Sequence, residues 1–208
     1  MKGNAIFLTA IERDGMPRDD PGPVSAAVTE ILHATAGLYE RAGFVEPWIG
    51  YLAVVEGTFV GTCAFKSVPA PRPHDPSGPM AVEIAYYTLP AFEGRGIATA
   101  MARRLIEIAW QSDPTLIVAA QTLPERNASH RVLQKLGFRH VAMAHDPEAG
   151  QVWEWQLRMA NHRPPLPCSS VATRQEPHGR PSGQRRARAR GGPSLDGGAP
   201  HNRTEPLI

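Results

Sequence analysis

Residues 82–110 decide the fold, and they read VEIAYYTLPAF, then EGRGIA, then TAMARRLIEIAW. The first part is rich in β-branched and aromatic residues, which favour a strand. The last part is mostly apolar, and its polar residues recur every four positions: Thr99, Arg103, Glu107 and Gln111. That spacing predicts one solvent-facing stripe on a largely buried helix. A turn containing Gly94 and Gly96 joins the strand to the helix.

This strand, turn and helix form a candidate site for an anion. The first N–H groups of a helix have no intrahelical acceptor, and the helix dipole places about half a positive charge there. Glycine at positions 94 and 96 lets a ligand approach the main chain closely. A diphosphate suits such a turn, although the spacing matches neither of the common phosphate loops. The alternative is a tight turn that simply needs small residues.

Several motifs, in the same order along the chain, resemble the GNAT family of acetyltransferases. Glu93-x-x-Gly96-x-Ala98 after a strand resembles the family's Gln/Arg-x-x-Gly-x-Gly/Ala loop. Residues 127–138 resemble the family's later helix that ends in Gly-Phe. Residues 47–53 and 146–155 are similar to the branch of ribosomal-protein N-acetyltransferases. Together the resemblance covers about residues 6–159.

The resemblance implies that acetyl-CoA is the cosubstrate. In this family the strand before the loop diverges from its parallel neighbour, and pantetheine lies in the gap like an extra strand. The main chain of three residues would pair with pantetheine here: Tyr87, Thr88 and Leu89. Loop amides and the first helical turn would hold the diphosphate: Glu93, Gly94, Arg95, Gly96, Ile97, Ala98 and Thr99.

Some positions depart from the family pattern. Glu93 stands where relatives have Gln or Arg, and a carboxylate beside a diphosphate is mildly repulsive. Arg95 is either a cation beside the phosphates or a solvated turn residue. Leu133 replaces the Tyr that many relatives use as general acid, which leaves Ser129 and Tyr87 as other donors. Asn127 either contacts CoA or only caps the helix, because the family's Asn falls one position earlier by count.

Acetyl transfer requires a neutral amine, so the acceptor decides how much a base must do. Freeing a lysine-type amine at neutral pH costs about 4–5 kcal/mol, whereas an α-amine near pKa 8 needs only about 1 kcal/mol. Glu83 is the candidate general base, because a carboxylate in an apolar strand either faces a cleft or has a partner. Burial would raise the pKa of Glu83 into a useful range, and a structural salt bridge is the alternative.

Periodicity predicts an α/β fold with one mixed sheet, in the order β-α-β-β-β-α-β-α-β-β, with helices on both faces. The resemblance implies that the central strands splay apart. The expected strands are residues 4–12, 49–55, 58–66, 81–89, 115–121, 139–144 and 152–158. The expected helices are residues 24–42, 99–111 and 125–136, with Gly43 and Gly137 at two of their ends. Glu56-Gly57 would turn a hairpin. A proline-rich loop spans residues 68–79.

Composition separates a domain at residues 1–160 from a tail at 161–208. The tail holds eight Arg and three acidic residues, a local charge of +5, which leaves −3 for the domain when subtracted from the net +2. The tail has no Trp, Tyr or Phe, so we expect it to be disordered, either solvated or a product of out-of-frame translation. The Arg-rich run at 185–190 is a non-specific signal, so we expect no nucleic-acid partner.

Other sequence features bound the function. No apolar run reaches about 18 residues, so we expect no membrane span, and the N-terminus is too charged for a signal peptide. Cys63 and Cys168 have no paired spacing, so we expect neither a disulfide scaffold nor a zinc site, and a cytoplasmic location is the default. The scattered His residues also indicate no metal site.

The leading functional hypothesis is an acetyl-CoA-dependent N-acetyltransferase. A primary amine, either a small molecule or a protein N-terminus, would attack the thioester directly in a ternary complex. A non-catalytic acyl-CoA-binding module is the second hypothesis, and a nucleic-acid adaptor with a basic tail is a minor third. A monomer and a homodimer both remain open.

Overall fold

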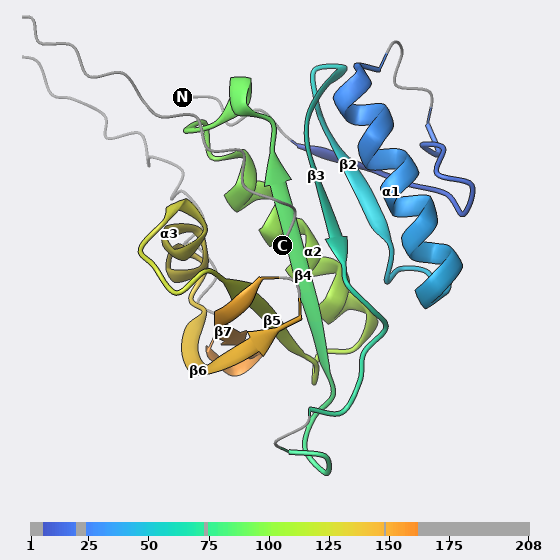
Figure 1. The fold of residues 1–208 in the computed structure, drawn as a ribbon. Coiled ribbons are helices and arrows are strands. Elements are labelled where there is room, and N and C mark those ends of the chain that lie inside the picture. Colours follow the sequence, from blue (N-terminus) through green and yellow to red (C-terminus); the bar gives the residue numbers. More distant parts are fainter. Residues whose placement is uncertain (1–5, 20–23, 73–74, 148, 162–208) are drawn as a thin grey trace, which may run out of the picture. The chain divides into compact units, whose positions relative to one another are not determined.

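The computed structural model describes residues 6–19, 24–72, 75–147 and 149–161, all within one compact unit (Figure 1). The elements follow the order that the sequence predicts: β1 (Phe7–Ala10), α1 (Ala26–Ala42), β2 (Gly50–Val55), β3 (Thr58–Phe65), β4 (Ala81–Thr88), α2 (Ile97–Ser112), β5 (Ile117–Thr122), α3 (Ala128–Lys135), β6 (Arg139–Asp146) and β7 (Gly150–Leu157). Short 3-10 turns cover Pro90–Phe92 and Met159–Asn161. The tail expected at residues 161–208 lies outside the described residues, apart from Asn161.

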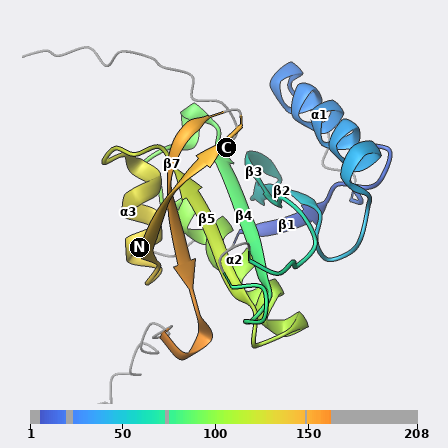
Figure 2. The same cartoon turned by 60° about the horizontal axis from the view of Figure 1, so that its bottom comes forward.

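The strands form one seven-stranded sheet in the order β1-β2-β3-β4-β5-β7-β6. The central pair β4–β5 is parallel, and every other neighbouring pair is antiparallel. Figure 2 shows α3 beside β7, and α1 over the part of the sheet formed by β1 to β3. The mixed sheet with splayed central strands is therefore confirmed.

Strand register assigns the helices to opposite faces of the sheet. A Cβ at Gly61, which pairs with Thr88, would point at Met101 of α2, so α2 covers that face. A Cβ at Gly50, which pairs with Ala64, would meet Thr35 and Tyr39 of α1. Because side chains alternate along a strand, the α2 face carries the even-numbered residues of β4, and the α1 face carries its odd-numbered residues.

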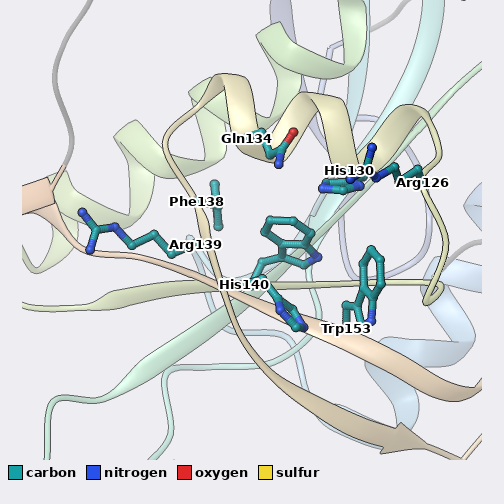
Figure 3. Close-up of a pocket in the computed structure, with 8 residues that line it drawn as sticks. Arg126, His130, Gln134, Phe138, Arg139, His140 and Trp153 are labelled. Carbon is teal, nitrogen blue, oxygen red and sulfur yellow. The ribbon is translucent and has the colours of Figure 1, made fainter.

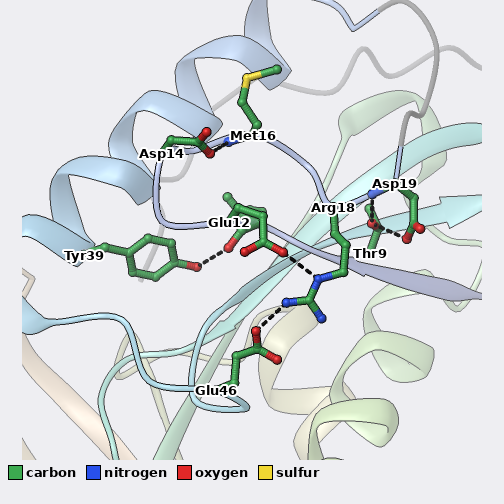
Figure 4. A network of polar contacts seen from close by, with 9 residues as sticks. Thr9, Glu12, Asp14, Met16, Arg18, Asp19, Tyr39 and Glu46 are labelled. Carbon is green, nitrogen blue, oxygen red and sulfur yellow. Dashed lines mark hydrogen bonds and ion pairs between the residues drawn. The ribbon is translucent and has the colours of Figure 1, made fainter.

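Helix α1 is fixed to the sheet by the hydroxyl of buried Tyr39. This hydroxyl donates to Ile11 O at 3.1 Å (Figure 4) and accepts from Gly50 N at 2.7 Å. Burial raises the pKa of Tyr39, so the phenol stays protonated and can donate. Next to it, Arg18 pairs with both Glu12 and Glu46 and ties the loop after β1 to the loop before β2.

The predicted turn chemistry is present at three sites. Glu56 and Gly57 have φ of 50° and 74°, the two positive angles that a tight two-residue hairpin turn requires. Asn127 caps α3, since its side chain accepts from His130 N at 3.0 Å. Gly137 has φ of 89° and follows α3, where Phe138 N donates to Leu133 O at 3.0 Å, which closes a Schellman motif.

Some predicted boundaries and one face were wrong. Thr99 is buried at 8% exposure, because the first turn of α2 lies against the sheet, whereas Gln111 is exposed as expected. Helix α3 begins at Ala128 rather than at residue 125, because Asn127 has an extended backbone at the cap. Part of the first predicted strand falls on residues 4–5, outside the described range, and β1 ends two residues earlier than predicted.

Within the described residues, none of the helices has the length and apolar character to cross a membrane. The same part of the chain holds no cluster of three or more metal-binding side chains. Cys63 is a free, fully buried thiol, and burial raises its pKa, whereas Cys168 lies outside the described residues.

The packing around Gly61 generates a stability prediction. An alanine Cβ there would lie 2.3 Å from Tyr87 O and 3.1 Å from Met101 Cε, so Gly61→Ala should lower the free energy of unfolding by about 1–3 kcal/mol. The control is Gly37→Ala in α1, where a Cβ meets only Arg41 at 3.6 Å and should stabilise by about 0.5–1 kcal/mol. Urea unfolding of both variants measures this. Equal midpoints would contradict the assigned packing.

Candidate active site

The two central strands form a fork. Strands β4 and β5 pair only at their first residues, from Ala81↔Ile117 to Glu83↔Ala119. Beyond Glu83, β4 continues to pair with β3 as far as Thr88, while β5 continues to pair with β7. The side of β4 that faces β5 therefore has no strand partner along its second half.

Hydrogen bonds to β3 show which main-chain groups face the fork. Glu83 O accepts from Lys66 N at 2.9 Å, and Leu89 N donates to Val60 O at 3.0 Å, so odd-numbered residues direct their main chain toward β3. Since main-chain direction alternates along a strand, the N–H and C=O groups of Tyr86 and Thr88 point toward the gap. The sequence predicted that the main chain of Leu89 pairs with pantetheine, but its N–H is already bonded to Val60 O.

The loop after β4 presents open main-chain donors. Gly94 and Gly96 have φ of 72° and 81°, and a Cβ built at either position has no neighbour within 4 Å. Gly96 precedes the first residue of α2, and no side chain caps this helix. Among the described residues, the N–H groups of 94–99 make no backbone hydrogen bond outside the helix. Such donors at a helix N-terminus bind anions.

Side chains at the ends of the predicted loop leave it accessible. Glu93 is exposed and has an extended backbone as it follows the 3-10 turn. Arg95 is also exposed, and its guanidinium lies 5.4 Å from the centre of the Phe92 ring, which it covers as a cation–π pair. Ile97 and Ala98 are half-buried, and the hydroxyl-bearing Thr99 is buried in the first turn of α2.

Two buried polar atoms at the open end of the fork have no hydrogen-bond partner among the residues that the structure describes: Thr88 Oγ1 on β4 and Gln121 Oε1 on β5. Because a buried polar atom without a partner costs about 1–3 kcal/mol, such atoms commonly mark a missing ligand or water. Together with the unpaired main chain of β4, they fit an extended polar chain such as the pantetheine arm of acetyl-CoA. The residues present therefore fit the cosubstrate that the sequence predicts.

Glu83 lies where the strands begin to diverge, and it has a partner. Its Oε1 is 2.9 Å from Lys66 Nζ, and the same ammonium lies 3.9 Å from Asp146 Oδ2. Although Glu83 Oε1 makes no hydrogen bond of regular geometry, the short contact is an ion pair. Glu83 is on the α1 face and keeps 24% of its side chain exposed, so the carboxylate is half-buried, paired and still reachable.

The two tyrosines of β4 point to opposite faces. Tyr87, the predicted catalytic residue, lies on the α1 face with Glu83. Tyr86 lies on the α2 face, and its hydroxyl donates to Ser129 O of α3 at 3.4 Å. Burial raises the pKa of Tyr86 well above its ordinary value, so the phenol stays protonated. Leu133, one turn further along α3, is fully buried.

Sequence reasoning missed Lys66, Tyr86 and Gln121. Lys66 follows β3 and reaches Glu83 only because β3 and β4 are antiparallel neighbours. Tyr86 could have been found from alternation, since it shares a face with buried Val82 and Ile84. Asn127 is confirmed as a cap, whereas its contact with CoA stays a prediction.

A small cavity lies next to Lys66. Trp48 packs against Phe65 with ring centres 5.0 Å apart, at an interplanar angle of 80°. Both rings and Lys66 line a cavity of about 10 Å³, which is no larger than one water molecule requires.

Comparison with known proteins identifies the family. The model of the acetyltransferase (GNAT) domain matches residues 13–139, more than half of the chain. The fold is similar to Salmonella typhimurium yncA, solved with its cofactor acetyl-CoA, with a TM-score of 0.53 and 20% identity over 79% of this chain and 100% of that one. It is also similar to RimL, a ribosomal-protein alpha-N-acetyltransferase, with a TM-score of 0.50 and 14% identity over 74% and 90%.

Two curated relatives match part of the sequence. N-acetylaspartate synthetase of Danio rerio is 33% identical over 97 residues, which is 46% of this chain and 31% of the relative. The same enzyme of Rattus norvegicus is 32% identical over 92 residues, which is 44% of this chain and 28% of the relative. The chain thus spans about a third of the length of these relatives.

The forked sheet, the open glycine turn and the family-model match over residues 13–139 all indicate the same family. The chain belongs to the GNAT family of acetyltransferases, whose cosubstrate is acetyl-CoA.

Proposed function

We propose that this chain transfers the acetyl group of acetyl-CoA to a primary α-amine by direct attack on the thioester in a ternary complex. The observation that carries the proposal is the fork, where unpaired main chain of β4 leads directly into the open donors of residues 94–99. Acetyl-CoA, when bound, supplies an activated acetyl group as a thioester. The chain's own residues bind acetyl-CoA and orient the amine. They also accept the proton of the incoming ammonium and donate a hydrogen bond to the departing sulfur.

The binding residues follow from the directions of their polar groups. N–H groups of residues 94–99 hold the diphosphate, with Arg95 as an added cation near it. The main chain of Tyr86 and Thr88 pairs with the pantetheine arm in the fork, and buried Thr88 Oγ1 and Gln121 Oε1 complete its hydrogen bonds. Asn127 caps the N-terminus of α3 and is a further candidate contact to CoA.

The catalytic roles divide between the two faces of β4. On the α1 face, Glu83 accepts the proton of the incoming ammonium, directly or through a water, and Tyr87 lies beside the acceptor. On the α2 face, Tyr86 donates a hydrogen bond to the departing sulfur from near Ser129. Tyr86 thereby supplies the hydroxyl that Leu133 lacks. A thiol of pKa about 8.5 leaves readily, so one hydrogen bond suffices.

The ion pair at Glu83 favours an α-amine over a lysine-type acceptor. Lys66 already occupies one oxygen of the carboxylate, so only the other oxygen is left to meet an incoming ammonium. An α-amine needs only about 1 kcal/mol to become neutral, against about 4–5 kcal/mol for lysine. The names of RimL and of N-acetylaspartate synthetase also describe acetylation of a protein α-amine and of an amino acid.

A screen of amino acids and peptides with free N-termini tests this function directly. Release of CoA thiol should occur with α-amines and should be slower, by at least about tenfold, with peptides whose only free amine is lysine. Isothermal titration with acetyl-CoA alone should give a measurable heat. No heat and no thiol release with any amine would refute the proposal.

Replacing the carboxylate at position 93 should improve cosubstrate binding. Glu93→Gln removes a negative charge next to the bound diphosphate, and the dissociation constant for acetyl-CoA should fall about two- to fivefold. The difference should shrink at high salt. The matched control is Glu56→Gln in the β2–β3 turn, which also removes an exposed carboxylate and should leave the constant unchanged. Equal effects would argue against a diphosphate beside Glu93.

A pair of variants separates a basic role of Glu83 from a structural one. Glu83→Gln should retain acetyl-CoA binding but lower kcat for a lysine-type amine at least about tenfold. Lys66→Met breaks the same ion pair yet keeps the carboxylate, so kcat should be retained or increased. If both variants lose the same fraction of activity and stability, Glu83 acts only through its salt bridge.

Phenylalanine substitutions test the two tyrosines of β4. Tyr86→Phe removes the hydroxyl that faces α3 and should lower kcat about tenfold with little change in KM. Tyr87→Phe should instead raise KM for the amine. Steady-state kinetics with both substrates varied distinguishes the two effects. If Tyr87→Phe lowers kcat and Tyr86→Phe raises KM, Tyr87 is the donor to sulfur.

A further inference from the structure

A second pocket lies between α3 and the β6–β7 hairpin, with a volume of about 460 Å³ (Figure 3). This volume lies within the range of about 300–1,000 Å³ that is typical of small-ligand sites. None of the residues assigned above to acetyl transfer lines it. The acetyltransferase chemistry therefore gives this pocket no role.

The floor of the pocket is aromatic. Trp155 is buried, and its indole N–H donates to Thr122 Oγ1 at 3.0 Å, which fixes this ring. His130 of α3 lies 4.8 Å from Trp155 and 5.5 Å from Trp153, measured between ring centres. His140 of β6 lies 5.3 Å from Trp153 and 5.5 Å from Trp155. Trp153 is only half-buried, so part of its surface is free to stack on a planar ring.

The rim of the pocket is cationic and carries unused donors. Arg126 and Arg139 stand at opposite ends, and Gln134 projects from α3 between them (Figure 3). Across the described part of the chain, these three side chains form no hydrogen bond or ion pair. No Asp or Glu lines the pocket, so nothing there neutralises the guanidinium groups. The pocket is thus suited to an anion.

The pocket and the fork use different sides of α3. Ser129 meets Tyr86 of β4, and Leu133 on the same stripe is buried in the core. His130 and Gln134 lie four residues apart and form the adjacent stripe, which faces β6 and β7. Arg126, in the loop before the helix cap, lines the same pocket. A ligand in the pocket would contact this second stripe and leave the fork open.

We propose that this pocket is a binding site for a planar aromatic ligand that carries an anionic group, of the class of nucleoside monophosphates. The ring stacks on the exposed part of Trp153, where base–indole stacking contributes binding energy without covalent chemistry. Gln134 can pair with a ring edge, since an amide both donates and accepts. Arg126 or Arg139 holds the phosphate. This inference does not depend on the acceptor proposed above.

Titration calorimetry of the full chain with AMP, adenosine and inorganic phosphate tests the site. AMP should bind at least about tenfold more tightly than either adenosine or phosphate, because it engages both the aromatic floor and the cationic rim. The dissociation constant for AMP should not change when the protein is saturated with acetyl-CoA. Absence of binding by AMP at millimolar concentrations would overturn the proposal.

Variants locate the site. Arg126→Ala and Arg139→Ala should together weaken AMP binding at least about tenfold and remove its advantage over adenosine. The matched control is Arg131→Ala. Arg131 is an exposed arginine of α3 that does not line the pocket, so its replacement should leave AMP binding unchanged. If the control is equally weakened, binding is only general attraction to basic surface. If acetyl-CoA displaces AMP, the pocket belongs to the cosubstrate site, and a separate ligand is excluded.

Discussion

The divergence of β4 from β5 is the constraint on which the rest of the site depends. A main-chain N–H or C=O inside a sheet needs a partner, and a parallel pair that separates after Glu83 and Ala119 leaves such groups unsatisfied. A ligand that is itself extended and rich in amides can replace the missing strand. The fork is therefore a place where the sheet leaves room for a long, polar carrier.

The position of the fork also determines what surrounds it. Because β4 runs directly into a glycine turn and α2, the unpaired strand and the helix N-terminus form one continuous series of donors. Packing of α2 against the sheet through residues such as Met101 holds that N-terminus in place. The buried face of this helix therefore determines where its open N-terminus lies relative to the fork.

The ion pair between Lys66 and Glu83 shows how a tertiary contact can alter a chemical interpretation. In the sequence, Glu83 is an isolated carboxylate within an apolar strand, which suggests a buried base. In the structure an antiparallel neighbour places an ammonium 2.9 Å away. Glu83 is therefore one member of an ion pair rather than an isolated carboxylate, and only one of its oxygens lacks this partner.

A similar lesson applies to α3. Its cap and its glycine end are local features, and both were predictable from Asn127 and Gly137. Its two stripes have different neighbours, however, since one meets β4 and the other meets the indoles of β7. Residues 126 and 153 are distant in the sequence and carry no shared motif. Their juxtaposition follows only from the strand order, in which β7 lies between β5 and β6.

By itself, the sequence determined the elements, their order, the glycine turn before α2 and the family, because period, turn residues and short motifs are local properties of the chain. Only the tertiary structure decided which groups face one another. The partner of Glu83, the opposite directions of Tyr86 and Tyr87, and the buried position of Thr99 depend on register and on helix placement. Register joins residues that are far apart along the chain, and no local pattern records that contact.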